Sequence, residues 1–550
     1  MLPAKNYQRA RTFSYNFHMI NYLKVGKATE LTGRDYRLYR ILEILPGFLS
    51  LGTLLALLFF SYFQPTWVAY FIIAFDVYWL LQVVFWALYL ISGFKELRTN
   101  EKINWEEKCK ALPVNFLLGS DYTEAEKAKK PLYEQGWSWS DVIHLIVLPT
   151  YNEDIEIIRS SLRSIVADGY PTKNMIVVLA IEGRAGETAK ERAAIVEAEF
   201  GQNFRNFLVT CHPDGIEGEL KGKGANQAWA AKEVKEKIID AQNLDYGKIL
   251  VSVFDIDTVV RPGYFFCLTY RFLTVEKPYR ASYQPVPLYH NNIWKAPFFA
   301  RVASSSNTFW QIMQQIRPEK LATYSSHSMT WKALADIGFW STSMVSEDSR
   351  IFWHCLLYYN GDYRVEPLYF PIYMDTTMDR NVWATAKSLY KQQRRWAWGS
   401  ENVPYLMFNT IKKWKEVDHK VMTGNIIVQI YGFQSWATSA LIIAVVGWMP
   451  MLLGGDRFNS TVLSGNLPAV TTWLMNLAMI GMLQSAVISN MLLPKRPKGL
   501  GLWKNILITI EWVFVPVSII FFGAVPCLDA QIRLALGKYM GFWVTPKTRE

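Results

Sequence analysis

The sequence predicts an α/β domain inserted between membrane segments. Almost continuously apolar runs occupy residues 45–94 and return after residue 424, whereas residues 95–423 contain no further run of that kind. A helix needs about 20 apolar residues to cross a bilayer, so the middle block is expected outside it. Within this block, short apolar strands alternate with helical patterns, which is typical of a doubly wound, Rossmann-like sheet.

The composition favours a membrane protein over a nucleic-acid-binding one. Hydrophobic residues make up 51% of the chain and aromatic residues 15%, a high share for a soluble protein. The formal charge is +11, and the Lys and Arg residues gather beside the apolar runs rather than on one soluble helix. We therefore expect the lipid bilayer, and no nucleic acid, as a partner.

The N-terminal part predicts a basic segment and a hairpin of two spans. Residues 1–44 hold eight Lys and Arg residues, and Lys95 and Arg98 follow the second apolar run. Basic residues stay on the cytoplasmic side, so both ends of the hairpin at 45–94 are expected there. Asp76 lies inside the second span, where a carboxylate is a functional candidate, although a pairing or interfacial role explains it equally well.

A linker is expected at residues 95–140 and the α/β domain at 141–380. Strands are predicted at 142–149, 175–181, 207–211 and 249–254, and helices at 155–166, 187–200 and 224–241. Such sheets bind ligands beyond the carboxyl ends of their strands. Thr150, Tyr151 and Glu153 follow the first strand, Glu182 follows the second, and Asp255 and Asp257 follow the fourth.

The D-x-D stretch after the fourth strand predicts a metal site. Asp255 and Asp257 are separated by one isoleucine, and alternate side chains of an extended chain point to the same side. Magnesium takes one or two carboxylates together with substrate phosphates and water. The alternative is a surface turn with two solvated acids.

Two later motifs carry further candidates. Glu347 and Asp348 begin a helical pattern, either as an N-terminal cap or, for one of them, as a general base that takes the proton of an incoming hydroxyl. Gln392, Arg395 and Trp396 share one face of a predicted helix. Guanidinium suits a diphosphate and indole a sugar ring, whereas an amphipathic interfacial helix is the alternative for residues 381–423.

The C-terminal part is expected to hold membrane or interfacial helices at 424–530 and a loop at 531–550. If the α/β domain is cytoplasmic, residues 424–453 lead out of the membrane and residues 467–493 lead back to a basic loop. We expect residues 505–525, which carry Glu511 and Pro516, to lie along the interface or to re-enter, since a full crossing would place the C-terminus outside.

Together these motifs resemble a known family. P-T-Y-N-E after a strand, K-x-x-N at 223–226, D-x-D, E-D and Q-x-x-R-W, in this order and spacing, resemble the membrane-embedded, inverting family 2 glycosyltransferases, such as cellulose, chitin, hyaluronan and mannan synthases. The resemblance covers residues 140–400. Phe542–Lys547 is similar to the F-x-V-T-x-K gating loop of cellulose synthases. The implied fold is a GT-A-type domain.

The resemblance implies a role for each matching position. For the nucleotide it implies Thr150, Tyr151, Glu153, Glu182, Lys223 and Asp255, and for Mg²⁺ or Mn²⁺ it implies Asp257 with Asp255. For the catalytic base it implies Asp348, for the diphosphate Gln392, Arg395, Thr545 and Lys547, and for the acceptor Trp396 and Glu347. Glu182 departs from the aspartate of many members, so it must reach the base of the nucleotide. His327 either touches the acceptor or is a buried structural residue.

The implied reaction transfers a sugar from a nucleotide sugar to the non-reducing end of a β-linked polysaccharide, which is extruded through the membrane. The donor is expected to be UDP-linked, as is usual in the family. The protein would be an integral membrane protein of the plasma or inner membrane with a cytoplasmic catalytic domain. One alternative is the addition of one sugar to a lipid-linked acceptor. A transporter would explain Asp76 but not the α/β block, and no repeated halves are visible.

Overall fold

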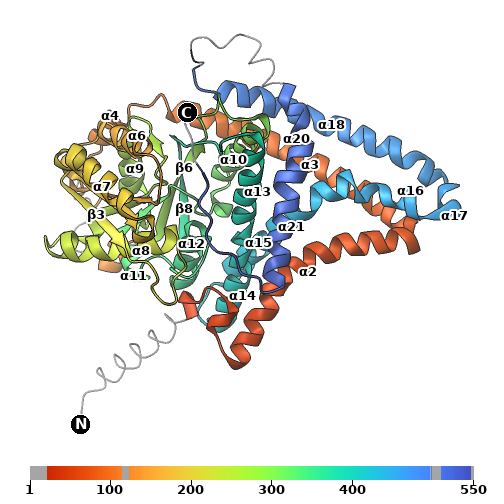
Figure 1. Ribbon diagram of the computed structural model, residues 1–550, viewed down its shortest axis with the longest axis horizontal. Helices are drawn as coiled ribbons and strands as arrows, with labels where there is room; N and C mark the ends of the chain where they lie inside the picture. Colours follow the sequence, from red (N-terminus) through yellow and green to blue (C-terminus); the bar gives the residue numbers. More distant parts are fainter. Residues whose placement is uncertain (1–21, 114–122, 496, 498–509, 547–550) are drawn as a thin grey trace.

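The computed structural model describes residues 22–113, 123–495, 497 and 510–546. An α/β domain lies on one side of the molecule and long helices extend from it on the other (Figure 1). The predicted fold class is confirmed in its main features: the chain contains an α/β domain with long apolar helices beside it.

One eight-stranded sheet, in the order β3-β2-β1-β4-β7-β6-β8-β5, forms the centre of the domain. Its strands are β1 Ile143–Thr150, β2 Met175–Glu182, β3 Asn206–His212, β4 Ile249–Val253, β5 Val259–Val260, β6 Ala281–Leu288, β7 Ser328–Thr330 and β8 Arg364–Tyr373. Strands β1 to β4 pair in parallel, with Val147 beside Val178 of β2 and Val253 of β4. This half agrees with the predicted sheet.

The other half of the sheet differs from the doubly wound prediction. Strand β7 runs antiparallel to both β4 and β6, and β5 runs antiparallel to β8. Strand β7 has three residues and β5 has two, which is too short to leave an apolar run in the sequence. The sheet is therefore mixed, and its antiparallel part could not be recognised from hydrophobic patterning.

Helices cover both faces of the sheet, which explains the continuous apolar strands. All eight residues of β1 are buried; Leu145 and Val147 pack with the α8 and α12 side, while Ile146 and Leu148 pack with the α6 and α9 side. The helices of the domain are α6 Ile155–Val166, α7 Glu187–Phe200, α8 Lys223–Val234, α9 Tyr264–Thr274, α10 Phe298–Gln315, α11 Trp331–Asp336 and α12 Glu347–Tyr358. The preceding linker contains α4 Trp105–Lys110 and α5 Glu124–Lys127.

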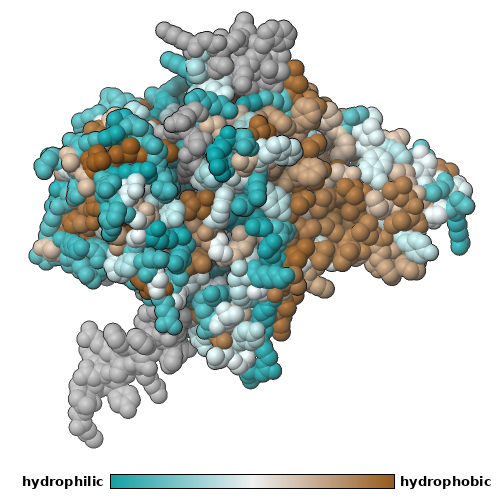
Figure 2. Space-filling model, viewed as in Figure 1, coloured by the Kyte–Doolittle hydropathy of each residue, from teal (hydrophilic) through white to brown (hydrophobic). Residues whose placement is uncertain are grey.

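Within the described residues, five stretches are long and apolar enough to cross a membrane. They are α2 Gly33–Phe63, α3 Pro65–Asn100, α15 His419–Ala444, α18 Val462–Leu492 and the stretch Glu511–Ala535. Apolar side chains form a broad brown band over these helices, whereas the α/β domain is largely teal (Figure 2). The outer end of the helices, with α16 Met449–Leu453 and α17 Gly455–Asn459, is more polar.

The stretch Glu511–Ala535 takes a different direction from the long helices. Its helices α20 Val515–Ile519 and α21 Val525–Ala535 run across the direction of α3 and α18, between these helices and the α/β domain (Figure 1). Helix α21 packs on α2 and on α13 Val382–Ala397, which is followed by α14 Asn402–Lys412. The segment 505–525 begins outside the described residues, so its interfacial placement stays a prediction.

Candidate active site

The loop after β1 is fixed by its own carboxylate. Glu153 Oε2 accepts hydrogen bonds from Thr150 Oγ1 at 2.8 Å and from the backbone N–H of Tyr151 at 2.7 Å. These are the three residues of the loop that the sequence assigns to the nucleotide. The loop therefore presents a rigid tyrosine ring at the carboxyl end of β1.

An arginine joins this loop to the end of β2. Arg184 Nε donates to Glu182 Oε2 at 2.5 Å, and its guanidinium lies 4.5 Å from the centre of the Tyr151 ring. The structure thus brings Glu182 and Tyr151 to the same place. The sequence analysis missed Arg184, although it lies three residues beyond a predicted strand, where polar residues are expected to reach a ligand.

Lys223 joins the D-x-D turn to the E-D motif. Its ammonium lies 2.7 Å from Asp255 Oδ1 and 2.8 and 3.0 Å from the two carboxylate oxygens of Asp348. Burial lowers the pKa of Lys223, but the negative charges of Asp255, Asp348 and Glu347 raise it, and the net shift is upward. Lys223 therefore stays charged and holds two carboxylates from distant motifs together.

The D-x-D residues lie in a turn rather than in an extended segment. The backbone N–H of Thr258 donates to Asp255 O at 2.8 Å, which closes a turn over Ile256 just before β5 begins. The extended geometry predicted for these residues is therefore wrong. Asp255 Oδ2 accepts from Ser325 Oγ at 2.6 Å, while buried Asp257 accepts from the backbone N–H of Asp375 at 2.8 Å.

The donors at this turn fit a divalent cation. Carboxylate oxygens of Asp255 and Asp257 are hard ligands, and Mg²⁺ needs only one or two of them beside substrate phosphates. Nowhere in residues 22–113, 123–495, 497 and 510–546 do three or more His, Cys, Asp or Glu side chains form a cluster suited to a metal. A metal cage made entirely of protein side chains is therefore missing from this part of the chain.

Glu347 and Asp348 begin α12 and have different surroundings. Burial of Glu347, together with repulsion by the carboxylate of Asp348, raises its pKa to about 8, although Lys223 and Arg395 act against this shift. A Cβ atom on Gly224 would lie 3.2 Å from Glu347 Cβ, so α8 and α12 begin in close contact. The upward shift of its pKa favours a neutral carboxyl for Glu347, whereas the ammonium of Lys223 contacts the neighbouring Asp348.

Helix α13 presents the Q-x-x-R-W side chains as predicted from their spacing. Gln392 Oε1 accepts from Thr377 Oγ1 at 2.6 Å, and Arg395 and Trp396 are half-buried on the same helix. The neighbouring Arg394 pairs instead with Asp529 of α21 at 2.9 Å. The pairing fixes α13 against α21, while Arg395 extends toward the C-terminal segment.

The C-terminal segment reaches the site. The Phe542 ring lies 4.8 Å from the guanidinium of Arg395, and a Cβ atom on Gly222 would lie 2.6 Å from Phe542 Cγ. Only glycine leaves room for this ring next to the start of α8. Thr545 is 6% exposed, and Lys547 lies outside the described residues.

Polar residues of the mixed half of the sheet complete the site and were missed. Asn291, after β6, donates to Asp257 O at 2.9 Å and to Asp375 Oδ1 at 2.8 Å. Asp375 follows β8, so the rule about strand ends would have found both residues had β6 and β8 been recognised. Ser326 Oγ, which lies 2.9 Å from Thr258 Oγ1, braces the other side of the turn.

His327 lies next to this loop and is buried. Its Nδ1 is 2.9 Å from the carbonyl oxygen of Tyr324, and the side chain is 1% exposed. Burial lowers the pKa of His327, so the ring is neutral. The burial agrees with the structural interpretation of this residue, and its contact with an acceptor stays a prediction.

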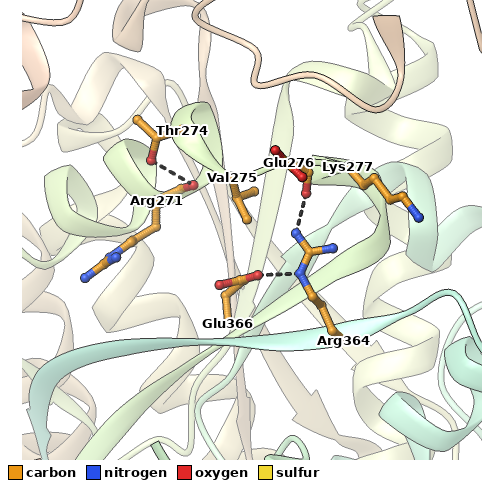
Figure 3. A pocket seen from close by; sticks show the side chains of 7 residues that line it. All are labelled: Arg271, Thr274, Val275, Glu276, Lys277, Arg364 and Glu366. Atoms are coloured by element: carbon orange, nitrogen blue, oxygen red, sulfur yellow. Dashed lines mark hydrogen bonds and ion pairs between the residues drawn. The ribbon is translucent and has the colours of Figure 1, made fainter. Parts of the chain in front are cut away.

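A pocket of about 600 Å³ lies at another place in the domain (Figure 3). Its lining includes the end of α9 and the start of β8, where Arg364 bonds to Glu366 and to the carbonyl oxygen of Glu276. Lys277, also in the lining, pairs with Asp362 at 2.7 Å. None of the residues that the sequence assigns to the donor, metal or acceptor lines this pocket.

Comparisons with known proteins give one family match and distant structural similarities. Residues 250–484 match the family model described as glycosyl transferase family group 2. No curated protein matches the chain. Solved structures are also similar to it, and two of them serve as examples. One is the mannosyltransferase PcManGT from Pyrobaculum calidifontis in complex with GDP-Man and Mn²⁺, with 13% identity over 75% of this chain and 99% of that chain and a TM-score of 0.38.

The other is residues 1–349 of S. aureus TarS, with 12% identity over 63% of this chain and 90% of that chain and a TM-score of 0.34. The family match, not these distant structures, carries the assignment, because it spans Asp257, Asp348 and Trp396. The protein is a glycosyltransferase whose residues 250–484 match family group 2.

Proposed function

We propose that the protein transfers a sugar, with inversion, from a UDP-linked donor to the non-reducing end of a β-linked polysaccharide. One observation carries this proposal: the ammonium of Lys223 contacts the carboxylates of Asp255 and Asp348 together. Lys223 and Asp348 are 125 positions apart in the sequence. Three predicted motifs thus meet at one point, as a shared donor and acceptor site requires.

The donor binds at the carboxyl ends of β1, β2 and β4 in this proposal. Tyr151 and Glu182 face the nucleotide base, and Arg184 orients both of them. Lys223 and Arg395 supply positive charge for the diphosphate, and guanidinium is well suited to phosphate oxygens. Thr545 closes over the donor from the C-terminal segment, and Lys547 is assigned the same role by its sequence position alone.

Asp255 and Asp257 would hold Mg²⁺ or Mn²⁺. The cation, when bound, neutralises charge that develops on the leaving diphosphate. The protein's own contribution is to hold the two residues. Ser325 Oγ donates to the carboxylate of Asp255, the backbone N–H of Asp375 donates to the carboxylate of Asp257, and Asn291 donates to the backbone carbonyl oxygen of Asp257.

Asp348 acts as the general base. It takes the proton of the acceptor hydroxyl while the hydroxyl oxygen forms a bond to the anomeric carbon. The bond from that carbon to the diphosphate breaks on the opposite face, so the configuration inverts. Neutral Glu347 donates a hydrogen bond to the acceptor, and the indole of Trp396 supports its sugar ring.

The long apolar helices would carry the product across the membrane. Lys and Arg residues on both sides of the hairpin α2–α3 favour a cytoplasmic catalytic domain. The small number of candidate spans, five in the described part of the chain, favours a second candidate function, the addition of one sugar to a lipid-linked acceptor.

Product analysis tests both functions. The purified full-length protein, in lipid nanodiscs with Mn²⁺ or Mg²⁺, is incubated with labelled nucleotide sugars, and the product is sized. We expect a long polymer with one donor and none with Asp348→Asn. A single sugar on extracted lipid would establish the second function instead. The absence of transfer from every nucleotide sugar would overturn both.

A further inference from the structure

We propose that Arg40, Glu43 and Tyr539 form a clamp that positions the C-terminal segment 536–546, here called the strap, over the donor site. The strap leaves α21 and runs back across the face of the α/β domain (Figure 1). This inference rests on the proposed function, because the clamp acts on donor binding through the strap. It assigns a positioning role to three residues outside the reacting groups.

The clamp begins where α21 ends. Arg40 Nη1 donates to the carbonyl oxygen of Leu534 at 2.9 Å, and Arg40 Nη2 donates to that of Ala535. The last carbonyl groups of a helix lack partners within the helix, so an arginine there both caps it and fixes the exit direction of the chain. A Cβ atom on Gly47 would lie 2.7 Å from Gln531 O, so α2 and α21 are in close contact.

Glu43 is the centre of the clamp. Its side chain is 1% exposed, and its Oε2 accepts from Arg40 at 2.7 Å and from the Tyr539 hydroxyl at 2.8 Å. Its Oε1 accepts from the backbone N–H of Ala28 at 2.9 Å. A buried carboxylate with three donors is held in one orientation, and hydrogen bonds to a charged group are stronger than neutral ones.

Few residues of the strap separate the clamp from the proposed donor site. Phe542, which packs on Arg395 and against Gly222, follows Tyr539 by three residues. Three residues span at most about 10 Å, so fixing Tyr539 limits where Phe542 can go. The next residue, Trp543, has Lys391 of α13 5.0 Å from its ring.

The clamp also relates the strap to the helix that carries the catalytic base. Ala28 belongs to a short N-terminal stretch whose Val25 carbonyl accepts from Arg350, two residues after Asp348, at 3.4 Å. The Leu23 carbonyl accepts from the Tyr405 hydroxyl at 2.9 Å. One stretch of chain thus connects α12 with Glu43, so the strap is positioned relative to Asp348.

Tyr539→Phe tests the clamp, because it removes one hydroxyl and keeps the ring. The reporter is a cysteine at Thr545, a strap residue that is 6% exposed. Cys211 is the exposed native cysteine in the described residues and is replaced by serine in the background. We expect Tyr539→Phe and Glu43→Gln each to raise the labelling rate of this cysteine about 5- to 20-fold. With Thr545 restored, each should raise the donor KM by a similar factor, with little change in kcat.

The double variant and two controls make the test sharp. If the two side chains act through one hydrogen bond, the double variant Glu43→Gln with Tyr539→Phe should raise the labelling rate only as much as the more severe single variant does. Independent effects would instead raise it by the product of the two single increases. Tyr36→Phe, at an exposed tyrosine of α2, should change neither the labelling rate of the reporter cysteine nor the KM for the donor. Labelling of buried Cys355 monitors general loosening and should stay slow.

Two results would overturn the clamp. One is an unchanged labelling rate of the reporter cysteine in both variants, and the other is an increase in the labelling rate of Cys355 as large as that of the reporter. The labelling experiment needs no turnover. An inactive wild-type protein would therefore refute the proposed function while the labelling rates still decide the clamp.

Discussion

The parallel and mixed halves of the sheet contribute to the site in different ways. In the parallel half, β3-β2-β1-β4, the polar residues directly follow buried strands and bond to near neighbours, as Glu153 does to Thr150. On the side of the mixed half, β7-β6-β8-β5, the partners come from far apart in the sequence, as Asn291 and Asp375 do. Local sequence patterns therefore describe the residues that follow β1, whereas the surroundings of Asp257 depend on contacts between residues far apart in the sequence.

The largest expected effect separates chemistry from donor binding. Asp348→Asn should lower kcat by about 10²- to 10⁴-fold, because an amide does not accept the acceptor's proton. The donor dissociation constant should change little if the parallel half binds the donor. Turnover and equilibrium donor binding are measured on the same preparation. Loss of donor binding with a residual kcat near the wild-type value would contradict this division.

The predictability of the fold follows the same division. Helices α6 and α7 occupy the predicted residues, and β1 to β4 lie within one residue of their predicted ends, because strands buried on both faces leave continuous apolar runs. Strand β8 contains Pro367 and Pro371 and pairs in a bulged register with β6, so no local pattern marks it. It was therefore missed, and Asp375 with it.

The site could be predicted only as far as its motifs allow. The order and spacing of the motifs led to Lys223, Asp255 and Asp348, which the structure brings into contact. The turn at Ile256 was only the alternative in the sequence analysis, and there with two solvated acids, whereas Asp257 is buried. The clamp residue Glu43 gave no signal, since its partner Tyr539 lies 496 positions away.

The next largest effect is expected at Asp257, which follows β4 of the parallel half and contacts residues that follow β6 and β8 of the mixed half. Asp257→Asn should raise the Mn²⁺ or Mg²⁺ concentration needed for half-maximal activity by at least about 10-fold, because one anionic ligand is lost. Titration of activity with each metal measures it. Asp362→Asn, at an exposed acid of the same domain, is the control. An unchanged metal requirement would place the cation elsewhere.

A smaller effect is expected within the parallel half. Glu182→Gln keeps the shape of the side chain but weakens the contact with Arg184, so Tyr151 and Arg184 lose part of their orientation. We expect the donor KM to rise about 3- to 10-fold with kcat nearly unchanged, a loss of uniform binding. Glu187→Gln, at an exposed position of α7, should leave both constants as they are. A fall in kcat alone would assign Glu182 to the chemistry.

The smallest effect concerns pH and the adjacent acids of α12. The pKa of Glu347 is raised from 4.5 to about 8 by burial and by Asp348, so its carboxyl is neutral below that pH and ionises above it. Ionisation would remove the hydrogen-bond donor and add a second negative charge beside Asp348, so wild-type activity should fall as the pH rises through about 8. Glu347→Gln stays neutral, and we expect its activity to persist there, within about threefold of the wild-type value at pH 7. A pH profile of kcat for both proteins, with Glu319→Gln as an exposed control, measures this. The same alkaline fall in Glu347→Gln would mean that another group titrates, and the donor role of Glu347 would then be wrong.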